Sequence, residues 1–268
     1  MSGWLSTHAP RSFSDLAMPE PVRDSLSAAS QTADPPHLLI TGPSGVGKTA
    51  AWHLVARQLL GPGWKSTTHV LQARDLVRQR GAMKTFEDFL RPGGSGSADT
   101  LAGRLSLDAF DRGISSSDTG GVAPAGTENT VVEGALPISR LIVIEDADYL
   151  GSIRQAYLRR MMETVGEASR FILVARAPSR IIDALRSRTQ MVRVPSTSRD
   201  TILSCLGDLT QIEGVKTADG VIEDIAYISE GNLRKAIFTL EMLHLRGLAN
   251  DSSAVHTLVQ STTMQSGR

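Results

Sequence analysis

Three runs of β-branched and other apolar residues stand out along the chain, and each is followed by a helical pattern. They are "HLLIT" at 37–41, "LIVIE" at 141–145 and "RFILVA" at 170–175. Strands that are apolar throughout and alternate with helices are typical of a parallel sheet with helices on both faces. The sequence therefore predicts an α/β domain over residues 1–195.

The rest of the chain follows other patterns. Residues 91–137 are rich in Gly, Ser, Thr and Pro and poor in apolar residues, which predicts a flexible insertion in the α/β domain. After Pro195 only helical spacing remains: Ser198 can cap one helix, 221–228 gives a second, and a third begins near Leu233. We expect a small all-helical domain at 196–247, followed by a C-terminal tail at 248–268.

Composition indicates the class of protein but not its activity. Of the 268 residues 41% are hydrophobic and 21% charged, which is ordinary for a globular protein, and the formal net charge is zero. Any affinity for nucleic acid must therefore come from a local patch. A single cysteine, Cys205, excludes an internal disulfide, and no apolar run approaches the roughly 18 residues of a membrane span. We expect a soluble protein of the cytoplasm, or of the nucleus in a eukaryote, with no membrane contact.

A phosphate-binding motif follows the first apolar run. "GPSGVGKT" fits G-x-x-x-x-G-K-[ST], and it stands between a predicted strand and an amphipathic helix, as the motif requires. Glycines let backbone N–H groups close around phosphates, the lysine reaches the terminal pair, and the threonine hydroxyl can ligate Mg²⁺. The helix start adds partial positive charge. The predicted nucleotide-binding residues are Gly42, Pro43, Ser44, Gly45, Val46, Gly47, Lys48 and Thr49.

An acidic pair ends the second apolar run in an unusual order. A phosphate-handling ATPase is expected to have Asp before Glu, and this chain has Glu145 before Asp146. Successive side chains on a strand point to opposite faces, so Glu145 faces the metal with one methylene more than the expected aspartate. Asp146 faces the attacking water with one methylene fewer than the expected glutamate. Alternatively, Glu145, Asp146 and Asp148 only cap the following helix.

Several motifs together resemble the small subunits of replication factor C, the AAA+ clamp loaders. They are "GPSGVGKT", "LIVIEDADYL", "QAYLRRMME", "RFILVARAPSRIIDALRSRT" and "EGNLRKAI", which match in order and spacing from about Trp4 to Leu243. The resemblance implies a P-loop AAA+ domain with a helical lid. It also implies ATP and Mg²⁺ as cofactors. The implied partners are the large and small clamp-loader subunits, a sliding clamp and primer–template DNA.

The resemblance assigns further roles residue by residue. Lys48 and Thr49 match its Walker A residues. Arg188 stands where the family places the finger that reaches a neighbour's ATP, and Arg234 resembles the second sensor, on the lid. Arg176 departs from the pattern, because the first sensor is usually Asn. There are two other departures. The stretch "WLSTHAP" keeps only Trp4 and Pro10 of the family's adenine-side box. The chain also stops soon after the lid, where the family continues into a collar domain.

Candidate DNA contacts are basic residues in two stretches. "SIRQAYLRRMME" holds an apolar stripe of Ile153, Tyr157 and Met161, which leaves Arg154, Arg159 and Arg160 on other faces; a solvated surface is the alternative. "RDLVRQRGAMK" supplies Arg80. Either "QRG" there or "DRGI" at 111–114 could match the family's Asp-Glu-Arg-Gly element.

These features favour a clamp-loader small subunit that binds Mg-ATP and whose own hydrolysis is weakened by the reversed acidic pair and by Arg176. A second hypothesis is a non-hydrolysing structural or regulatory AAA+ subunit of a replication or repair complex. A third is a stand-alone P-loop kinase, which predicts a monomer.

Overall fold

A computed structural model describes residues 3–90, 138–164, 168–253 and 255. The predicted insertion at 91–137, "DRGI" and most of the predicted tail lie outside these residues. Contacts divide the chain into two compact units. Of the described residues, the first unit contains 3–9, 43–47, 195–253 and 255, and the second contains 10–42, 48–90, 138–164 and 168–194.

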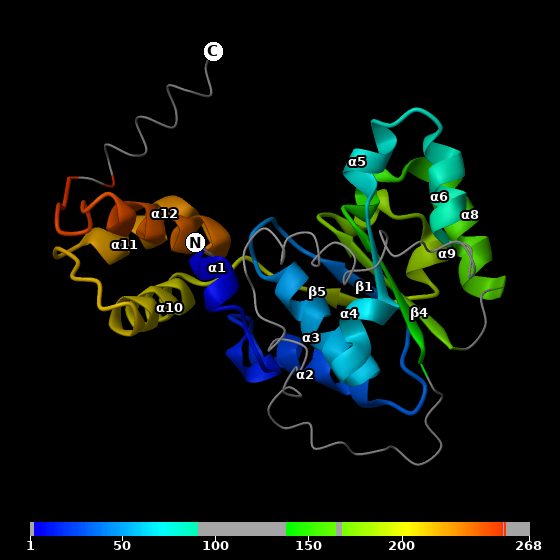
Figure 1. Cartoon of the computed structure of the whole chain (residues 1–268), viewed down its shortest axis with the longest axis horizontal. Helices are drawn as coiled ribbons and strands as arrows, with labels where there is room; N and C mark the ends of the chain where they lie inside the picture. Colours follow the sequence, from blue (N-terminus) through cyan, green and yellow to red (C-terminus); the bar gives the residue numbers. More distant parts are fainter. Residues whose placement is uncertain (1–2, 91–137, 165–167, 254, 256–268) are drawn as a thin grey trace. The chain divides into compact units, whose positions relative to one another are not determined.

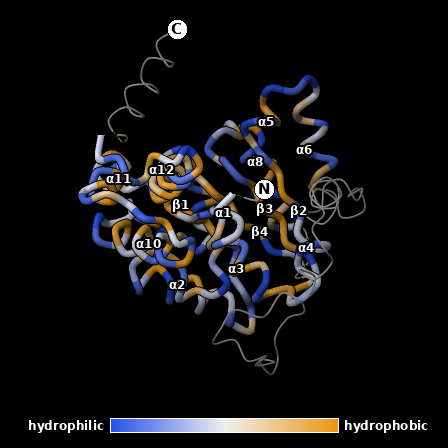
Figure 2. The backbone as a smooth tube through the Cα atoms, turned by 60° about the vertical axis from the view of Figure 1, so that its left-hand side comes forward, coloured by the Kyte–Doolittle hydropathy of each residue, from blue (hydrophilic) through white to orange (hydrophobic). Residues whose placement is uncertain are grey.

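The second unit is built on a parallel sheet of five strands in the order β2-β3-β4-β1-β5. The strands are β1 (Leu38–Thr41), β2 (Thr68–Gln72), β3 (Arg140–Glu145), β4 (Ser169–Ala175) and β5 (Gln190–Arg193). β1 is buried along its whole length, as expected for a strand covered on both faces. Along the tube of Figure 2 the central strands are coloured as hydrophobic. The predicted α/β sheet is confirmed.

Helices cover both faces of this sheet (Figure 1). One face packs against α5 (Ala73–Val77), α6 (Ala82–Leu90), α8 (Gly151–Thr164) and α9 (Asp183–Arg186) in one apolar cluster that contains Phe86, Leu158 and Phe171. Helices α2 (Glu20–Gln31) and α3 (Lys48–Leu60) contact each other and strands β5 and β4, respectively. The short helix α4 (Trp64–Thr67) leads into β2. The carboxyl ends of the strands therefore share one edge, where ligands of open α/β sheets bind.

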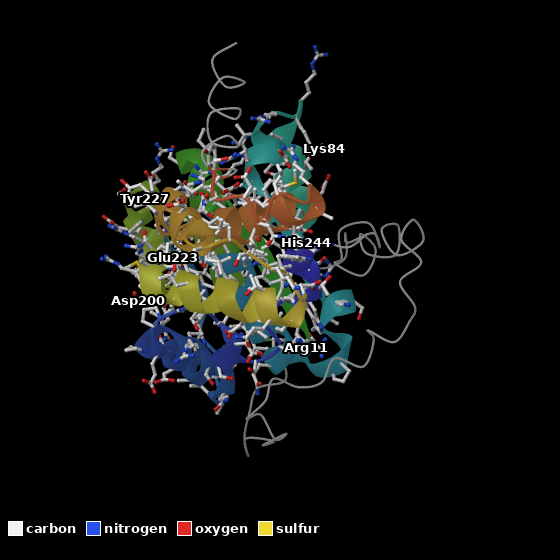
Figure 3. The ribbon with its side chains drawn as sticks, turned by 90° about the vertical axis from the view of Figure 1, so that its left-hand side faces the viewer. Arg11, Lys84, Asp200, Glu223, Tyr227 and His244 are labelled. Atoms are coloured by element: carbon white, nitrogen blue, oxygen red, sulfur yellow. The ribbon has the colours of Figure 1, made fainter. Side chains whose placement is uncertain are left out.

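The first unit has a helical core. It combines α10 (Arg199–Ile212), α11 (Val221–Ser229) and α12 (Leu233–Leu245), and Ser198 caps α10 by accepting from the Thr201 amide at 3.1 Å. Polar residues such as Asp200 and Glu223 lie on the outer faces, together with the exposed Tyr227 (Figure 3). The predicted lid of three helices is confirmed.

The N-terminal helix α1 (Trp4–Thr7) belongs to this helical unit. Trp4 is buried among the lid's apolar residues, and its ring lies 5.5 Å from that of His244 on α12. Its backbone N–H donates to the Glu241 carboxylate at 3.1 Å. Trp4, which the sequence placed in an adenine-side box, therefore serves as an apolar anchor of α1 on α12.

None of the helices in the described ranges is both long and apolar enough to cross a membrane.

A half-buried histidine just before β1 makes the stability of the sheet sensitive to acid. His37 Nδ1 accepts a hydrogen bond from the Phe171 amide at 3.1 Å, and its ring meets that of Phe171 edge-on. Burial, and then the charge of Arg170, lower the pKa of His37 to about 4. The neutral ring is therefore the form that the fold selects, since an acceptor nitrogen cannot carry a proton.

We predict that acid weakens the fold through this residue. The unfolded histidine, with an ordinary pKa near 6.5, binds the proton more tightly than the folded one. Stability is therefore full above that value and falls as the pH drops from about 6.5 toward 4. At pH 5 the loss from one such group is about 2 kcal/mol. Urea unfolding at pH 7 and pH 5 will show a smaller difference for His37→Gln than for the wild type; an equal difference would exclude His37 as the cause.

Candidate functional site

The loop between β1 and α3 has the backbone that its glycines were predicted to provide. Gly42, Gly45 and Gly47 have φ values of 151°, 78° and 91°, which residues with a Cβ atom rarely adopt. At position 42 a Cβ would also lie 2.1 Å from the Val194 carbonyl oxygen. Pro43 and Ser44 are exposed, whereas the side chain of Val46 is buried. The chain therefore has no alternative to glycine at position 42.

Within the first unit, the start of α12 lies against this loop. The Arg234 amide donates to the Gly45 carbonyl at 3.0 Å. Asn232 caps α12 by accepting from the Lys235 amide at 3.0 Å, and its Oδ1 occupies the space that a Cβ at position 45 would need. Arg234 thus touches the loop through its backbone, while the residue itself is exposed.

Lys48 and Thr49 open α3, at the place where amide groups lack partners inside the helix. Lys48 Nζ donates to the Gly42 carbonyl at 2.7 Å, so the ammonium spans the loop. The Thr49 hydroxyl donates to Glu145 Oε1 at 2.9 Å. A hydroxyl and a carboxylate in contact are the oxygen ligands that Mg²⁺ prefers, so these two residues fit the predicted metal.

Glu145, the last residue of β3, accepts hydrogen bonds at both carboxylate oxygens. Oε1 accepts from Thr49 and also from the Trp52 indole at 2.9 Å, and Oε2 accepts from the Gln72 amide. Gln72 is the residue of β2 that pairs with Glu145 across the sheet. Neither donor was predicted from the sequence, although Trp52 lies one helical turn beyond Thr49 and could have been noticed there.

Asp146 does not continue the strand, so strand alternation does not set its direction. β3 ends at Glu145, and Asp146 has left-handed backbone geometry with φ 52°. Its carboxylate lies 3.4 Å from Arg74 Nε. Arg74 also donates to the Tyr149 hydroxyl at 3.2 Å and stacks over that ring. The predicted water-side carboxylate is therefore paired with a guanidinium that the sequence analysis had not singled out.

Arg176 follows β4, which pairs with β1 so that Ala175 stands beside Thr41. It therefore leaves the sheet at the same edge as Gly42. Its backbone N–H donates to Asp148 Oδ1 at 3.4 Å, and the residue is exposed. Asp148 thus helps to fix the turn after β4. It lies in the short helical turn after β3, so it can stabilise that turn as well.

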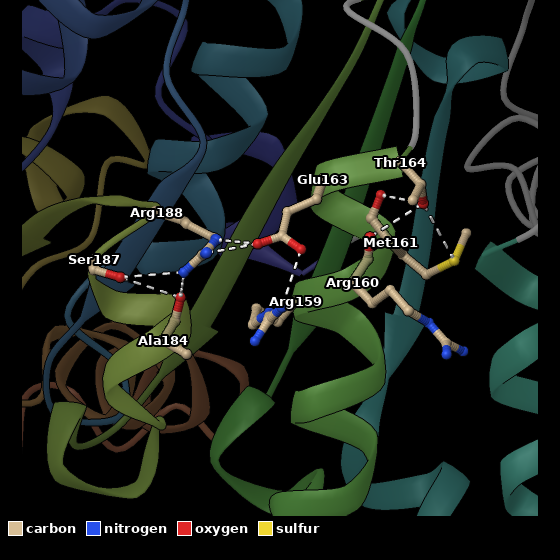
Figure 4. A network of polar contacts seen from close by, with 8 residues as sticks. All are labelled: Arg159, Arg160, Met161, Glu163, Thr164, Ala184, Ser187 and Arg188. Atoms are coloured by element: carbon tan, nitrogen blue, oxygen red, sulfur yellow. Dashed lines mark hydrogen bonds and ion pairs between the residues drawn. The ribbon is translucent and has the colours of Figure 1, made fainter.

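Arg188 is held by groups of its own unit (Figure 4). It donates from Nε to Glu163 Oε1 at 2.9 Å and from a terminal nitrogen to the Ala184 carbonyl at 2.8 Å. Glu163 Oε2 accepts from Arg159 at 3.1 Å, and hydrogen bonds from Arg159 and then Arg188 lower the pKa of this exposed carboxylate. The predicted finger therefore lies at the surface with its guanidinium ion-paired.

The four candidate DNA residues lie in the second unit. Arg159, Arg160 and Arg80 are exposed, and Arg154 is half-buried and donates to the Leu150 carbonyl at 3.1 Å. The predicted apolar stripe of α8 is wrong at its first member, since Ile153 is 76% exposed. The buried face is formed by Gln155, Leu158 and Met162. The last two each lie one position after a member of the predicted stripe.

In the part of the chain that the structure describes, no three His, Cys, Asp or Glu side chains gather as metal ligands. The Thr49–Glu145 contact is therefore the best-supported metal position, and it supplies only two ligands. Mg²⁺ usually keeps several waters and takes further oxygens from substrate phosphates, so a pair beside a phosphate loop suits it.

Comparison with family models gives two matches. Residues 38–196 match the ATPase family associated with various cellular activities (AAA). Residues 204–245 match the RCF1/5-like AAA+ ATPase lid domain. The first match covers the sheet and the predicted phosphate-binding loop, and the second covers most of the three lid helices.

Curated relatives extend the similarity over most of the chain. A replication factor C small subunit 2 of Pyrobaculum islandicum is 29% identical over 244 residues, covering 89% of this chain and 62% of the relative. Replication factor C subunit 5 of Schizosaccharomyces pombe is 30% identical over 256 residues, covering 92% and 66%. The resemblance seen in the sequence is confirmed, and the chain spans a little under two thirds of these relatives' length.

Solved structures show the same fold at low identity. One RuvB point variant of Thermotoga maritima matches with a TM-score of 0.63 and 16% identity, over 95% of this chain and 72% of that one. Another, described as a RuvB Holliday junction branch migration motor, has a TM-score of 0.58, 17% identity and the same coverage. At such identity the likeness supports the architecture alone.

Proposed function

Because the chain belongs to the AAA family of ATPases, we propose that it is a clamp-loader small subunit that binds Mg-ATP. In this role it helps to open a sliding clamp and load it onto primer–template DNA. The observation that carries the proposal is the loop after β1, with Lys48 across it and Thr49 in contact with Glu145. Similarity to replication factor C small subunits supports the specific role.

In this proposal the phosphates lie against the loop amides from Gly42 to Thr49, and Lys48 leaves the Gly42 carbonyl to bind the terminal pair. Thr49 and Glu145 would hold Mg²⁺, which neutralises phosphate charge when it is bound. Arg234, exposed at the first turn of α12, would be the second-sensor residue of this proposal.

Hydrolysis at this site would be slow. A carboxylate that positions the attacking water must reach it, and about 1 Å of displacement can cost on the order of a hundredfold in rate. Asp146 is one methylene shorter than glutamate, and its carboxylate is paired with Arg74. Arg176 adds a positive charge where the family has a neutral asparagine.

The proposed partners follow from the outer arginines. Arg188 would leave Glu163 to reach the nucleotide of a neighbouring large or small subunit, because a guanidinium suits spread phosphate charge. Arg154, Arg159, Arg160 and Arg80 would contact the DNA backbone. The compartment would be the cytoplasm, or the nucleus in a eukaryote.

A second candidate is a non-hydrolysing structural or regulatory AAA+ subunit of a replication or repair complex. The ion pair of Asp146 with Arg74 favours it, since a guanidinium already satisfies the water-side carboxylate. In that case the bound nucleotide would not be hydrolysed and would serve a structural role only.

Capture of the tagged chain from extracts of its own cells tests the clamp-loader role. We expect a larger clamp-loader subunit and a sliding clamp to be recovered with it. Sedimentation of the chain with the recovered subunits will then show a hetero-oligomer. A chain that stays monomeric with them and recovers neither partner would contradict the role and favour the stand-alone kinase.

A further inference from the structure

Glu145 has more freedom than the aspartate expected at its position, because its side chain has one more rotatable bond. A metal-side carboxylate that rotates freely loses entropy each time it is fixed. The structure fixes it instead through donors on both oxygens, two on Oε1 and one on Oε2. The longer side chain is therefore restrained before any metal arrives.

Trp52 supplies the least replaceable of these donors. Its indole is 1% exposed, and it lies one turn after Thr49 on α3, so both side chains reach the same carboxylate oxygen. A buried indole N–H needs an acceptor, and Glu145 is that acceptor. His53 packs against the Trp52 ring with centroids 4.1 Å apart, and the Trp64 ring lies 5.4 Å from that of His53.

Two polar groups of this cluster are uncharged at neutral pH. Burial is the main cause that lowers the pKa of His53 to about 4, so its ring packs as a neutral group. Gln72 approaches Glu145 from the paired position on β2 and is neutral as well. Neither group therefore places a competing cation against Glu145.

The hydrogen-bond capacities leave room for a metal. A hydroxyl has one proton and two lone pairs, and an ionised carboxylate can accept about four hydrogen bonds. Thr49 uses its proton on Glu145 and keeps its lone pairs. Three donors on Glu145 leave further acceptor capacity, so this arrangement orients both ligands without using them up.

We propose that Trp52 and Gln72 are positioning residues that hold the Glu145 carboxylate beside Thr49 and so compensate for its extra methylene in binding magnesium. This inference rests on the proposed binding of Mg-ATP. It assigns to Trp52 and Gln72 a role toward the metal. Partners that orient a metal ligand typically contribute about 10-fold to 100-fold in metal affinity.

The test is Trp52→Phe, which keeps a buried aromatic ring and removes the N–H. Binding of a fluorescent ATP analogue is followed while Mg²⁺ is titrated. We expect the Mg²⁺ concentration at half-saturation to rise about tenfold, with unchanged analogue binding in EDTA. Trp64→Phe is the matched control, since it alters a buried tryptophan of the same aromatic cluster; its Mg²⁺ requirement will be that of the wild type.

A double-variant comparison separates positioning from general packing. In a Glu145→Ala background, Trp52→Phe should add no further change, because residues that act through one group are not additive. Gln72→Leu should raise the Mg²⁺ requirement in the same direction, and it decides the matter if Trp52→Phe fails to fold. The inference would be overturned if a folded variant needed no more Mg²⁺ than the wild type. It would also be overturned if Trp52→Phe had its full effect in the Glu145→Ala background. A wild type that binds no analogue at all would instead refute the proposed function.

Discussion

Replacing Lys48 with alanine will lower the affinity for ATP by about a hundredfold or more. Hydrogen bonds to charged groups contribute roughly 1.5–3 kcal/mol each, and the ammonium is expected to make two with the terminal phosphates. Their loss corresponds to two or more factors of ten in the dissociation constant. Fluorescence anisotropy of a labelled ATP analogue measures it directly.

Lys84→Ala is the matched control for this experiment. Lys84 is an exposed lysine on α6 (Figure 3), so its removal changes the net charge equally without touching the loop. We expect its affinity to equal that of the wild type. A thermal melt of Lys48→Ala will show that the fold survives, and undiminished affinity in that folded variant would rule out the loop as a phosphate site.

Exchanging the acidic pair, as Glu145→Asp with Asp146→Glu, will accelerate single-turnover hydrolysis by about a hundredfold at saturating Mg²⁺ and ATP. The longer side chain at position 146 places its carboxylate roughly 1 Å further out, a distance that can change such a rate by about a hundredfold. Saturation with both ligands removes any effect of weaker metal binding in the variant. Quenched mixing with radiolabelled ATP follows the single turnover.

Asp148→Glu lengthens the third carboxylate of the same acidic cluster and serves as its control. Asp148 contacts the Arg176 backbone, so we expect no acceleration from it. Equal rates for the wild type and the exchanged variant would show that the order of the pair does not limit hydrolysis. The non-hydrolysing alternative would remain only if both rates were negligible.

The core of the fold could be predicted because its signals are contiguous in sequence. The first strand, the glycine loop and the following helix stand side by side, and the three lid helices show plain apolar spacing. Two strands were not predicted. β2 buries the polar side chains of Thr68 and His69, and edge strand β5 buries only Val192, so neither forms an apolar run.

The site could be predicted only where local sequence determines it. Lys48 and Thr49 follow from the motif, but the partners of Glu145 depend on strand register and those of Asp146 on where the strand ends. An Asp in left-handed geometry after a buried strand has no local sequence signal here. For that reason the contacts of Asp146 with Arg74 and of Glu145 with Gln72 became visible only in three dimensions.

The contact between Gly45 and Asn232 has a consequence for the evolution of the sequence. The two positions are far apart in sequence, yet a side chain at 45 would displace the amide that caps α12. A mutation at either position therefore changes the selection acting on the other. Among related chains, those that retain asparagine at 232 should retain glycine at 45, and replacement of that glycine would also require a different residue at 232.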